Sequence, residues 1–177
     1  MEAGGVTGRD AWTSLEDKAL LAQCEVDFYR ASGPGGQKRN KTSSAVRLRH
    51  PPSGLIVIAE ESRSQHENRA RAFKRLRRAL WLEIRQELPE GDLAGHAAVV
   101  AARDRSGSLW VGPKDPRYLP LAGVLLDALQ AGNGRLAETA AHFGLGSAAL
   151  GDLLRQDDDA WKETGRIRRV HGLKSLH

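Results

Sequence analysis

The sequence predicts an α+β fold, in which a small antiparallel sheet with a long packed helix and a projecting glycine-rich loop is followed by a mostly helical C-terminal module. Two observations favour the sheet and its helix. Apolar and polar residues alternate in residues 24–30 and 45–50, which is the period of strands. A helix-start signal at Ser64 opens an apolar repeat of three and four residues. From residue 121 onward, apolar helical stripes separated by glycine turns predict the helical module.

Length and charge limit the possible organisation and partners. A chain of 177 residues, 40% of them apolar, can hold one ordinary domain or two small ones. Residues 30–85 carry 14 Lys/Arg against 4 Asp/Glu, whereas the remainder carries 13 against 18. The cationic excess covers loop, strands and helix, which favours a polyanion such as nucleic acid over a merely solvated helix face.

A single cysteine, Cys24, excludes an internal disulfide and suits a reducing compartment. No apolar run reaches the 18 residues that predict a membrane helix. Acidic residues at positions 2, 10, 16 and 17 are atypical of a mitochondrial presequence. We therefore expect a cytoplasmic protein with no membrane partner, and we expect a monomer.

The N-terminal extension, residues 1–23, is rich in glycine at first and then favours a short helix capped by Ser14. The following strand, residues 24–30, is expected to be half-buried and places Val26 and Phe28 on one face, with Glu25, Asp27 and Tyr29 on the other.

This strand leads into a shaped glycine loop, Arg30–Gln37. Three glycines among residues 33–36 allow positive φ and close approach to another molecule, while Pro34 fixes one φ. The cations that follow, at positions 38, 39 and 41, favour an anionic ligand. The spacing excludes a P-loop and a dinucleotide fingerprint. The tripeptide Gly35-Gly36-Gln37 alone is also compatible with a surface turn.

A hairpin and a long helix follow the loop. Residues 45–50 place Val46 and Leu48 inward, a Pro-Pro-Ser-Gly turn follows, and the dense β-branched run 55–59 predicts a central strand. Ser64 and Glu67 form a capping box. The helix that it opens should end at Pro89 and Gly91. Its predicted buried stripe consists of Ala70, Phe73, Leu76, Leu80, Ile84 and Leu88.

The C-terminal half divides into a predicted linker at 91–120, a helical module at 121–160 and a basic tail at 161–177. Within the module, a helix, a Gly-Leu-Gly turn and a helix capped by Ser147 have the order of a helix-turn-helix. An ordinary helical bundle is favoured over DNA recognition, because the second helix carries one cation and one acid. The tail carries five cations against one acid, which indicates either an RNA contact or a solvated last helix.

No Ser-His-Asp constellation and no Cys-His cluster with metal spacing is visible, so we expect neither a metal nor a cofactor. Structural roles are favoured for His50 and His66, near strand and helix ends. An enzyme built on this sequence must therefore work without a conventional nucleophile.

A long ordered pattern runs from residue 24 to residue 88. It comprises the segment Cys24–Lys41 around the glycine loop, then Ser44–His50, Pro52–Leu55, Arg63-Ser64-Gln65 and Asn68. This pattern closely resembles the catalytic domain of class I peptide chain release factors. The resemblance implies that residues 24–90 form such a domain.

The resemblance also implies a chemistry. Release factors hydrolyse the ester of peptidyl-tRNA in the ribosomal peptidyl-transferase centre, so the implied partners are the ribosome, peptidyl-tRNA and rRNA. Gly35, Gly36 and Gln37 would be the catalytic positions, with the Gln37 backbone N–H stabilising developing charge. The Gln37 side chain would admit water, and a glutamine methyltransferase would be a further partner. The implied RNA-binding residues, with two from the tail, are Arg30, Ser32, Lys38, Arg39, Asn40, Lys41, Arg47, Arg63, Gln65, Arg168 and Arg169.

Only about 23 residues precede the matching pattern, which is too short for a stop-codon-reading domain. A catalytic domain followed by a basic tail instead resembles the ribosome-rescue hydrolases. The chain departs from them in its less basic tail and its additional helical module. The alternative is a non-catalytic RNA- or ribosome-binding protein, or a helix-turn-helix DNA-binding protein, that retains the same fold.

Overall fold

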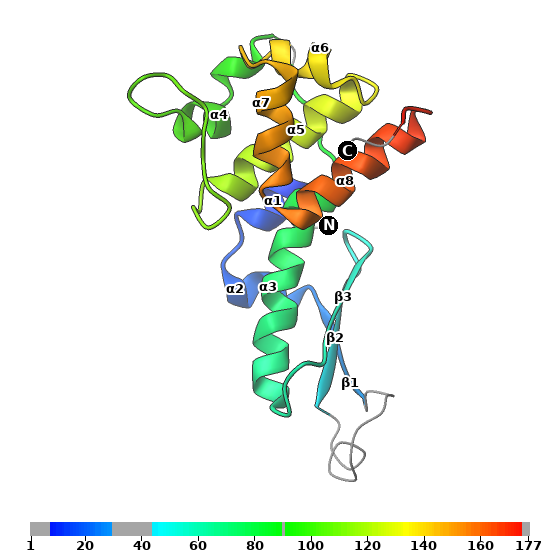
Figure 1. Cartoon of the computed structure of the whole chain (residues 1–177). Helices are drawn as coiled ribbons and strands as arrows, with labels where there is room; N and C mark the ends of the chain where they lie inside the picture. Colours follow the sequence, from blue (N-terminus) through cyan, green and yellow to red (C-terminus); the bar gives the residue numbers. More distant parts are fainter. Residues whose placement is uncertain (1–7, 30–43, 90, 175–177) are drawn as a thin grey trace, which may run out of the picture. The chain divides into compact units, whose positions relative to one another are not determined.

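The computed structural model describes residues 8–29, 44–89 and 91–174. The chain folds into two compact units, Met1–Leu80 and Trp81–His177, and the boundary falls near the end of helix α3 (Gln65–Glu83). Figure 1 shows the helices and strands of both units in their order along the chain.

A three-stranded antiparallel sheet forms the centre of the first unit. Its strands are β1 (Glu25–Tyr29), β2 (Ala45–His50) and β3 (Leu55–Ala59), in the order β1-β2-β3. The predicted hairpin between the second and third strands is confirmed, with His50 opposite Leu55. The prediction that residues 55–59 form the central strand is wrong, because β2 lies between the other two.

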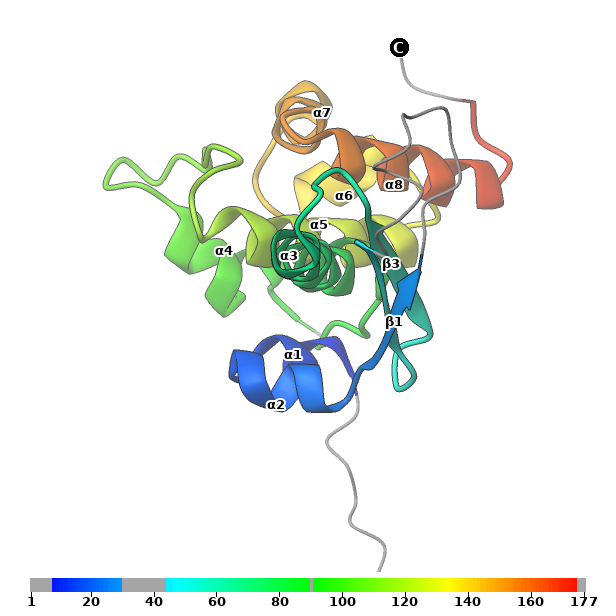
Figure 2. The ribbon, with the colours of Figure 1, turned by 90° about the horizontal axis from the view of Figure 1, so that it is seen from below.

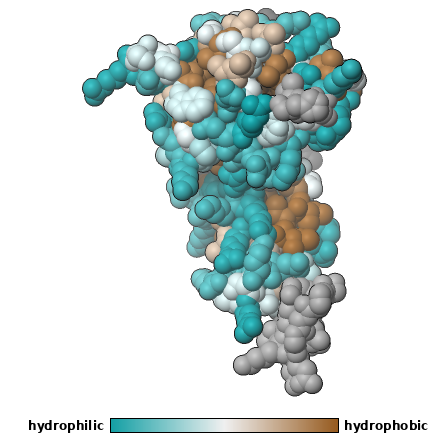
Figure 3. Space-filling model, in the orientation of Figure 1, coloured by the Kyte–Doolittle hydropathy of each residue, from teal (hydrophilic) through white to brown (hydrophobic). Residues whose placement is uncertain are grey.

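The two isoleucines of β3 lie on the outer face of the sheet. Ile56 and Ile58 are 53% and 43% exposed, and Figure 3 shows apolar surface over this strand. They pair with Arg49 and Arg47 on the same outer face of the sheet. Val46 and Leu48 on the inner face are fully buried, as their alternation predicts.

The turn from β2 to β3 depends on Gly54. Its φ of 74° lies in the left-handed region, which glycine adopts without steric cost. In this conformation the Gly54 N–H donates to the carbonyl of His50 over 3.0 Å and closes the hairpin.

Helix α3 contributes the helical side of the core. Its buried stripe contains Ala72, Leu76, Ala79 and Leu80, whereas Ala70, which the sequence pattern placed inside, is exposed. Ala70 lies two residues from Ala72, which is a rotation of about 200° around a helix. The stripe therefore follows the i, i+4 row of Ala72, Leu76 and Leu80.

The helix also ends earlier than predicted, at Glu83 rather than near Pro89. Two contacts within the second unit explain this ending. The Arg85 side chain donates to the carbonyl of Leu82, and the backbone N–H of Gln86 donates to the Asp127 carboxylate over 3.1 Å. These bonds satisfy groups that would otherwise continue the helix.

Two short helices, α1 (Arg9–Thr13) and α2 (Asp17–Ala22), precede the sheet. The predicted helix start at Ser14 is wrong, because Ser14 terminates α1 and Glu16 precedes α2. Arg77 of α3 donates to the Leu15 carbonyl over 2.7 Å and holds this segment against the helix.

The described part of the second unit contains the 3-10 helix η2 (Leu93–Gly95) and five α-helices (Figure 2), of which α5 is buried along most of its length. The α-helices are α4 (Ala97–Ala102), α5 (Tyr118–Ala131), α6 (Leu136–Ala141), α7 (Ser147–Arg155) and α8 (Asp158–Val170). Their common core includes Leu121, Leu125 and Leu129, which the sequence placed on one stripe. Val99 and Leu109, from the segment expected to be a linker, also belong to this core.

Two helix starts differ in how their first N–H groups are satisfied. Ser147 is the first residue of α7 and not its cap, since the preceding Gly146 occupies the cap position without a side-chain bond. By contrast, the Asp157 carboxylate accepts from the backbone N–H groups of Asp159 and Ala160, at 3.1 Å each. Helix α8 therefore begins before residue 161 and carries most of the predicted basic tail. Across the described ranges, no helix combines the length and apolarity needed to cross a membrane.

Candidate functional site

The candidate site is the connection between β1 and β2. The predicted catalytic positions Gly35, Gly36 and Gln37 lie outside the described residues, as do Arg30, Ser32, Lys38, Arg39, Asn40 and Lys41. The structure describes both ends of this connection, because Tyr29 and Ala45 are paired in the antiparallel ladder. The loop thus leaves and re-enters the sheet at neighbouring positions.

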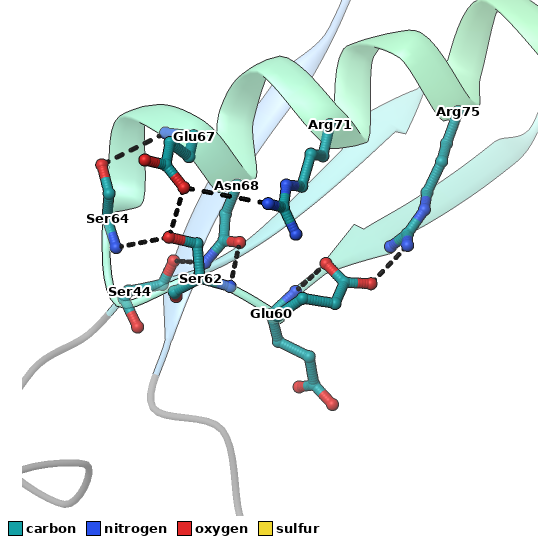
Figure 4. A network of polar contacts seen from close by, with 9 residues as sticks. Ser44, Glu60, Ser62, Ser64, Glu67, Asn68, Arg71 and Arg75 are labelled. Atoms are coloured by element: carbon teal, nitrogen blue, oxygen red, sulfur yellow. Dashed lines mark hydrogen bonds and ion pairs between the residues drawn. The ribbon is translucent and has the colours of Figure 1, made fainter.

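Asn68 of α3 holds the return end of the loop (Figure 4). Its side-chain amide donates to the backbone carbonyl of Ser44 over 2.7 Å and to that of Ser62 over 2.8 Å. Its amide oxygen accepts the backbone N–H of Ser62 over 2.9 Å. Asn68 is fully buried, so these bonds replace water for both ends of its amide. They fix the start of β2 to the first turns of α3.

The start of α3 forms part of the same network. The Ser64 hydroxyl accepts the backbone N–H of Glu67 over 3.3 Å, which is the cap that the sequence predicts. In a capping box, the Glu67 carboxylate would accept from the backbone N–H of Ser64, the cap residue. In this protein Glu67 has a different partner. The Glu67 carboxylate accepts from the Ser62 hydroxyl over 2.6 Å, and that hydroxyl accepts the backbone N–H of Ser64 over 3.0 Å. Ser62 therefore replaces the cap residue as the partner of Glu67.

The other end of the loop is held by the segment after β3. The Tyr29 hydroxyl donates to the Glu60 carboxylate over 3.4 Å, and burial together with this carboxylate raises the pKa of Tyr29. The Arg75 guanidinium donates to the Ile58 carbonyl and to the Glu61 carboxylate. The hydrogen bond from Arg75 lowers the pKa of Glu61 and keeps this carboxylate ionised.

Three of the predicted RNA-binding residues lie in the described part of the first unit. Arg63 and Gln65 are exposed and flank the Ser64 cap, so they lie beside the network at the base of the loop. Arg47 lies on the outer face of β2, where it donates to the Asp27 carboxylate over 2.8 Å and 3.0 Å. The structure thus brings Arg63 and Gln65 to the loop base and leaves Arg47 along the sheet.

The other two predicted RNA-binding residues, Arg168 and Arg169, lie on α8 in the second unit. Arg168 donates to the backbone carbonyls of Gly134, over 2.7 Å, and of Lys174. Arg169 is exposed in the last turn of the helix.

His50 has the structural surroundings that the sequence favoured. It is fully buried, its ring nitrogens lie 2.7 Å from the Ser53 hydroxyl and 3.1 Å from the Gln23 amide oxygen, and Trp12 packs edge-on against its ring. Burial lowers the pKa of His50 and favours the neutral ring. Within the described ranges, no group of three or more His, Cys, Asp and Glu side chains is placed to hold a metal ion.

Asn68, Ser62 and Ser44 were not among the predicted site residues. The sequence did contain one signal for Asn68, which lies four residues before Ala72 and eight before Leu76 on the same helical row. A polar side chain in a buried stripe requires hydrogen-bond partners. Its partners could not be identified, since the Ser44 carbonyl lies 24 residues away along the chain.

Comparison with known proteins identifies the part of the chain that contains the sheet, helix α3 and the start of the second unit. The RF-1 domain family model matches residues 18–103. Peptide chain release factor 1 of Acidiphilium cryptum is 47% identical over 85 residues, which cover 48% of this chain and 24% of the relative. Peptide chain release factor 1 of Granulibacter bethesdensis is 49% identical over 81 residues, covering 46% of this chain and 23% of the relative.

Similarity at about the same identity extends to a peptide chain release factor 2. Peptide chain release factor 2 of Campylobacter lari is 46% identical over 84 residues, which cover 47% of this chain and 22% of the relative. The match thus spans about a quarter of the length of these relatives. Residues 18–103 therefore form an RF-1 domain of the class I release factor-like family.

Proposed function

We propose that this protein hydrolyses the ester bond of peptidyl-tRNA on the ribosome and frees the nascent peptide without reading a stop codon. The observation that carries the proposal is the RF-1 domain match over residues 18–103, with Gly35-Gly36-Gln37 placed between β1 and β2.

The chemistry requires little from side chains. An aminoacyl ester is already activated, so hydrolysis needs a positioned water and stabilisation of charge on an oxygen. A backbone N–H aimed at that oxygen is suited to the second task. By the resemblance to release factors, the N–H of Gln37 takes this role, and Gly35 and Gly36 allow the backbone to adopt the required conformation. The Gln37 side chain then selects water over larger nucleophiles, and a glutamine methyltransferase modifies it.

The described base of the loop supports this role. Asn68 holds Ser44 at the return end, and Glu60 accepts from Tyr29 at the leaving end. A main-chain donor can stabilise a transition state only if its position is fixed before the substrate arrives. The two described ends of the loop are thus held by different elements, one by helix α3 and the other by the segment that follows β3, and this supports a pre-positioned donor.

Codon-independent rescue is the finer part of the proposal. It rests on the order of the chain, in which the catalytic domain is followed by a helix with basic residues at its end, Arg168 and Arg169. This order resembles that of the ribosome-rescue hydrolases. The partners in this proposal are the ribosome, its rRNA and peptidyl-tRNA.

The test is peptide release from purified ribosomes that carry labelled peptidyl-tRNA. One set is stalled at the end of a truncated mRNA, and a second set has a stop codon in the A site. We expect release from the truncated complexes in a single turnover, with no requirement for the stop codon. Release from the stop-codon complexes alone would contradict codon independence. Ribosome binding without release from either complex would instead favour the non-catalytic binder.

A further inference from the structure

A groove opens on the surface of the second unit between α6, α7 and α8. Its volume is about 600 Å³, and α7 packs against both of the other helices. Part of its lining consists of small or apolar residues, namely Leu136, Ala137, Ala148 and Gly151. The size is within the range of about 300–1,000 Å³ that is typical of sites for small ligands.

Three guanidinium groups line the walls of this groove. Arg135 pairs with Glu138 over 3.2 Å, and Arg155 pairs with Asp152 over 3.0 Å. Each of these four side chains is about half exposed or more, so the pairs are screened and open to exchange. Arg168 donates to the carbonyls of Gly134 and Lys174, which are neutral acceptors. Its positive charge is therefore not cancelled by these contacts.

An aromatic platform completes the site. The Arg155 guanidinium lies over the Trp161 ring, 4.6 Å from its centroid, and both residues line the groove. Stacked aromatic rings and guanidinium planes are the surfaces on which proteins hold unpaired bases. Cations beside such a platform bind the phosphates that connect the bases.

The turn that contains Gly134 lies close against α8 and holds Arg168 in a fixed position. A Cβ added to Gly134 would lie 3.1 Å from the Cα of Arg168, and the φ of Gly134 is +75°. Only glycine allows the turn to approach α8 this closely. The 2.7 Å bond from Arg168 to the Gly134 carbonyl fixes the same approach. Arg168 thus presents its charge from a rigid position.

We propose that this groove binds one or two nucleotides of single-stranded RNA, with a base stacked on the Arg155–Trp161 platform and phosphates at Arg135 and Arg168. Duplex DNA fits the observations less well. A recognition helix must protrude into a major groove, whereas the exposed face of α7 lines a concave surface and carries Asp152 beside Arg155. An acidic peptide could use the cations but has no base for the platform. This proposal does not depend on hydrolysis by the first unit.

The test uses the full chain and short single-stranded oligoribonucleotides, with photo-crosslinking through 4-thiouridine followed by mass spectrometry. We expect crosslinks on the peptide that contains Trp161, in addition to any within residues 30–85. Affinity is measured by fluorescence anisotropy at several salt concentrations. Arg135→Ala should weaken binding at all base compositions and lower the salt slope by about one. Trp161→Ala should weaken it about 5- to 150-fold, the range for loss of one stacked base.

Lys162→Ala is the matched control, because Lys162 lies on the same helix, is exposed and does not line the groove. It should change affinity less than about twofold, since it removes a cation without removing a contact. If Trp161→Ala fails to fold, Arg155→Ala replaces it in the test. Arg155 is the other half of the stacked pair and is about half exposed, so its removal should disturb the fold less.

Three results would overturn the proposal. Crosslinks confined to residues 30–85 would exclude RNA from the groove. Equal effects of Arg135→Ala and Lys162→Ala would indicate unspecific attraction to the surface charge. Duplex DNA binding more tightly than the single strand, or full competition by an acidic peptide, would assign the groove to a different partner. Loss of peptide release with the crosslinks intact would count against the proposed function alone.

Discussion

The two units differ in charge and in the size of their cores. The first unit, residues 1–80, carries 15 Lys/Arg against 9 Asp/Glu, whereas residues 81–177 carry 12 against 13. Among the described residues, 10 buried apolar side chains belong to the first unit and 20 to the second. The first unit thus combines a strong cationic bias with half as much buried apolar material.

This difference shows which interactions each unit depends on. A small core stabilises weakly, so polar contacts such as those of Asn68 and His50 matter more to the first unit. Its surface charge favours a polyanion but opposes compactness. The second unit has the core of an ordinary helical domain, and its groove cations lie on α7, on α8 and directly before α6.

The largest effect should come from the core of the second unit. Leu125→Ala removes a side chain that is 1% exposed at the centre of α5, and should lower the free energy of unfolding by about 2–5 kcal/mol. Native-state hydrogen exchange should show faster exchange of the α5 amides. Leu119→Ala, on the same helix but only partly buried, should cost less. If the β2 amides accelerate as much as those of α5, the units do not open separately and the comparison fails.

A smaller effect is expected at the loop base of the first unit. Asn68→Leu keeps the size of the side chain but leaves the Ser62 N–H and the Ser44 carbonyl without their partner. The substitution should lower the free energy of unfolding by about 1–3 kcal/mol, measured by urea unfolding. Peptide release should fall as well, because the loop loses an anchor.

Arg71→Ala is the control for this substitution. It lies on the same helix and breaks only an exposed 3.9 Å ion pair with Glu67. Unchanged release in Asn68→Leu would show that the network supports the fold and not the site.

The free energy of unfolding of the first unit should depend on pH through the titration of His50. Because burial lowers the pKa of His50 below its ordinary value of 6.5, the unfolded chain binds this proton at a higher pH than the folded chain. Its contribution to stability should therefore be complete above pH 6.5 and decrease as the pH falls below it. The slope cannot exceed about 1.4 kcal/mol per pH unit for one proton.

Urea unfolding between pH 7.5 and pH 5 measures this slope. His50→Gln should flatten it, and His66→Gln, which changes an exposed residue, should leave it unchanged. Equal slopes in the wild type and in His50→Gln would contradict the assignment.

The smallest effect on stability should come from the charged surface. Arg47 and Asp27 are 44% and 49% exposed, so Arg47→Gln should change the free energy of unfolding by about 0.2–1 kcal/mol. If the charge serves RNA binding, the same variant should weaken ribosome binding and reduce its salt dependence by about one phosphate contact. A large loss of stability with unchanged binding would reverse the interpretation of this surface.

Much of the fold could be predicted from local patterns. The alternation of Val46 and Leu48 and the stripe of α5 depend on near neighbours in the sequence, and the structure confirms both. The order of the strands could not be predicted in the same way. The β-branched run 55–59 suggested a central strand, but pairing placed β2 between β1 and β3. Strand order depends on contacts between distant segments, which composition does not specify.

The candidate site also has features that local sequence predicts and features that depend on tertiary contacts. The glycine loop and the Ser64 cap have local signatures, and the resemblance to release factors depends on them. The anchors of the loop depend on tertiary contacts, such as the bond from Asn68 to the Ser44 carbonyl and the bond from Tyr29 to Glu60. The same reason explains the helix end at Glu83, which is determined by Asp127 more than 40 residues away.

The central claim is that a main-chain donor at Gln37 stabilises the transition state of ester hydrolysis. Single-turnover release from ribosomes stalled on truncated mRNA tests it most directly, with Gln37→Pro compared against Gln37→Ala. Proline removes the N–H, so release should fall by about 10²- to 10³-fold, while ribosome binding is retained. Alanine keeps the N–H and should still release peptide while admitting other nucleophiles. Wild-type release by Gln37→Pro, or complete loss in Gln37→Ala, would contradict the claim.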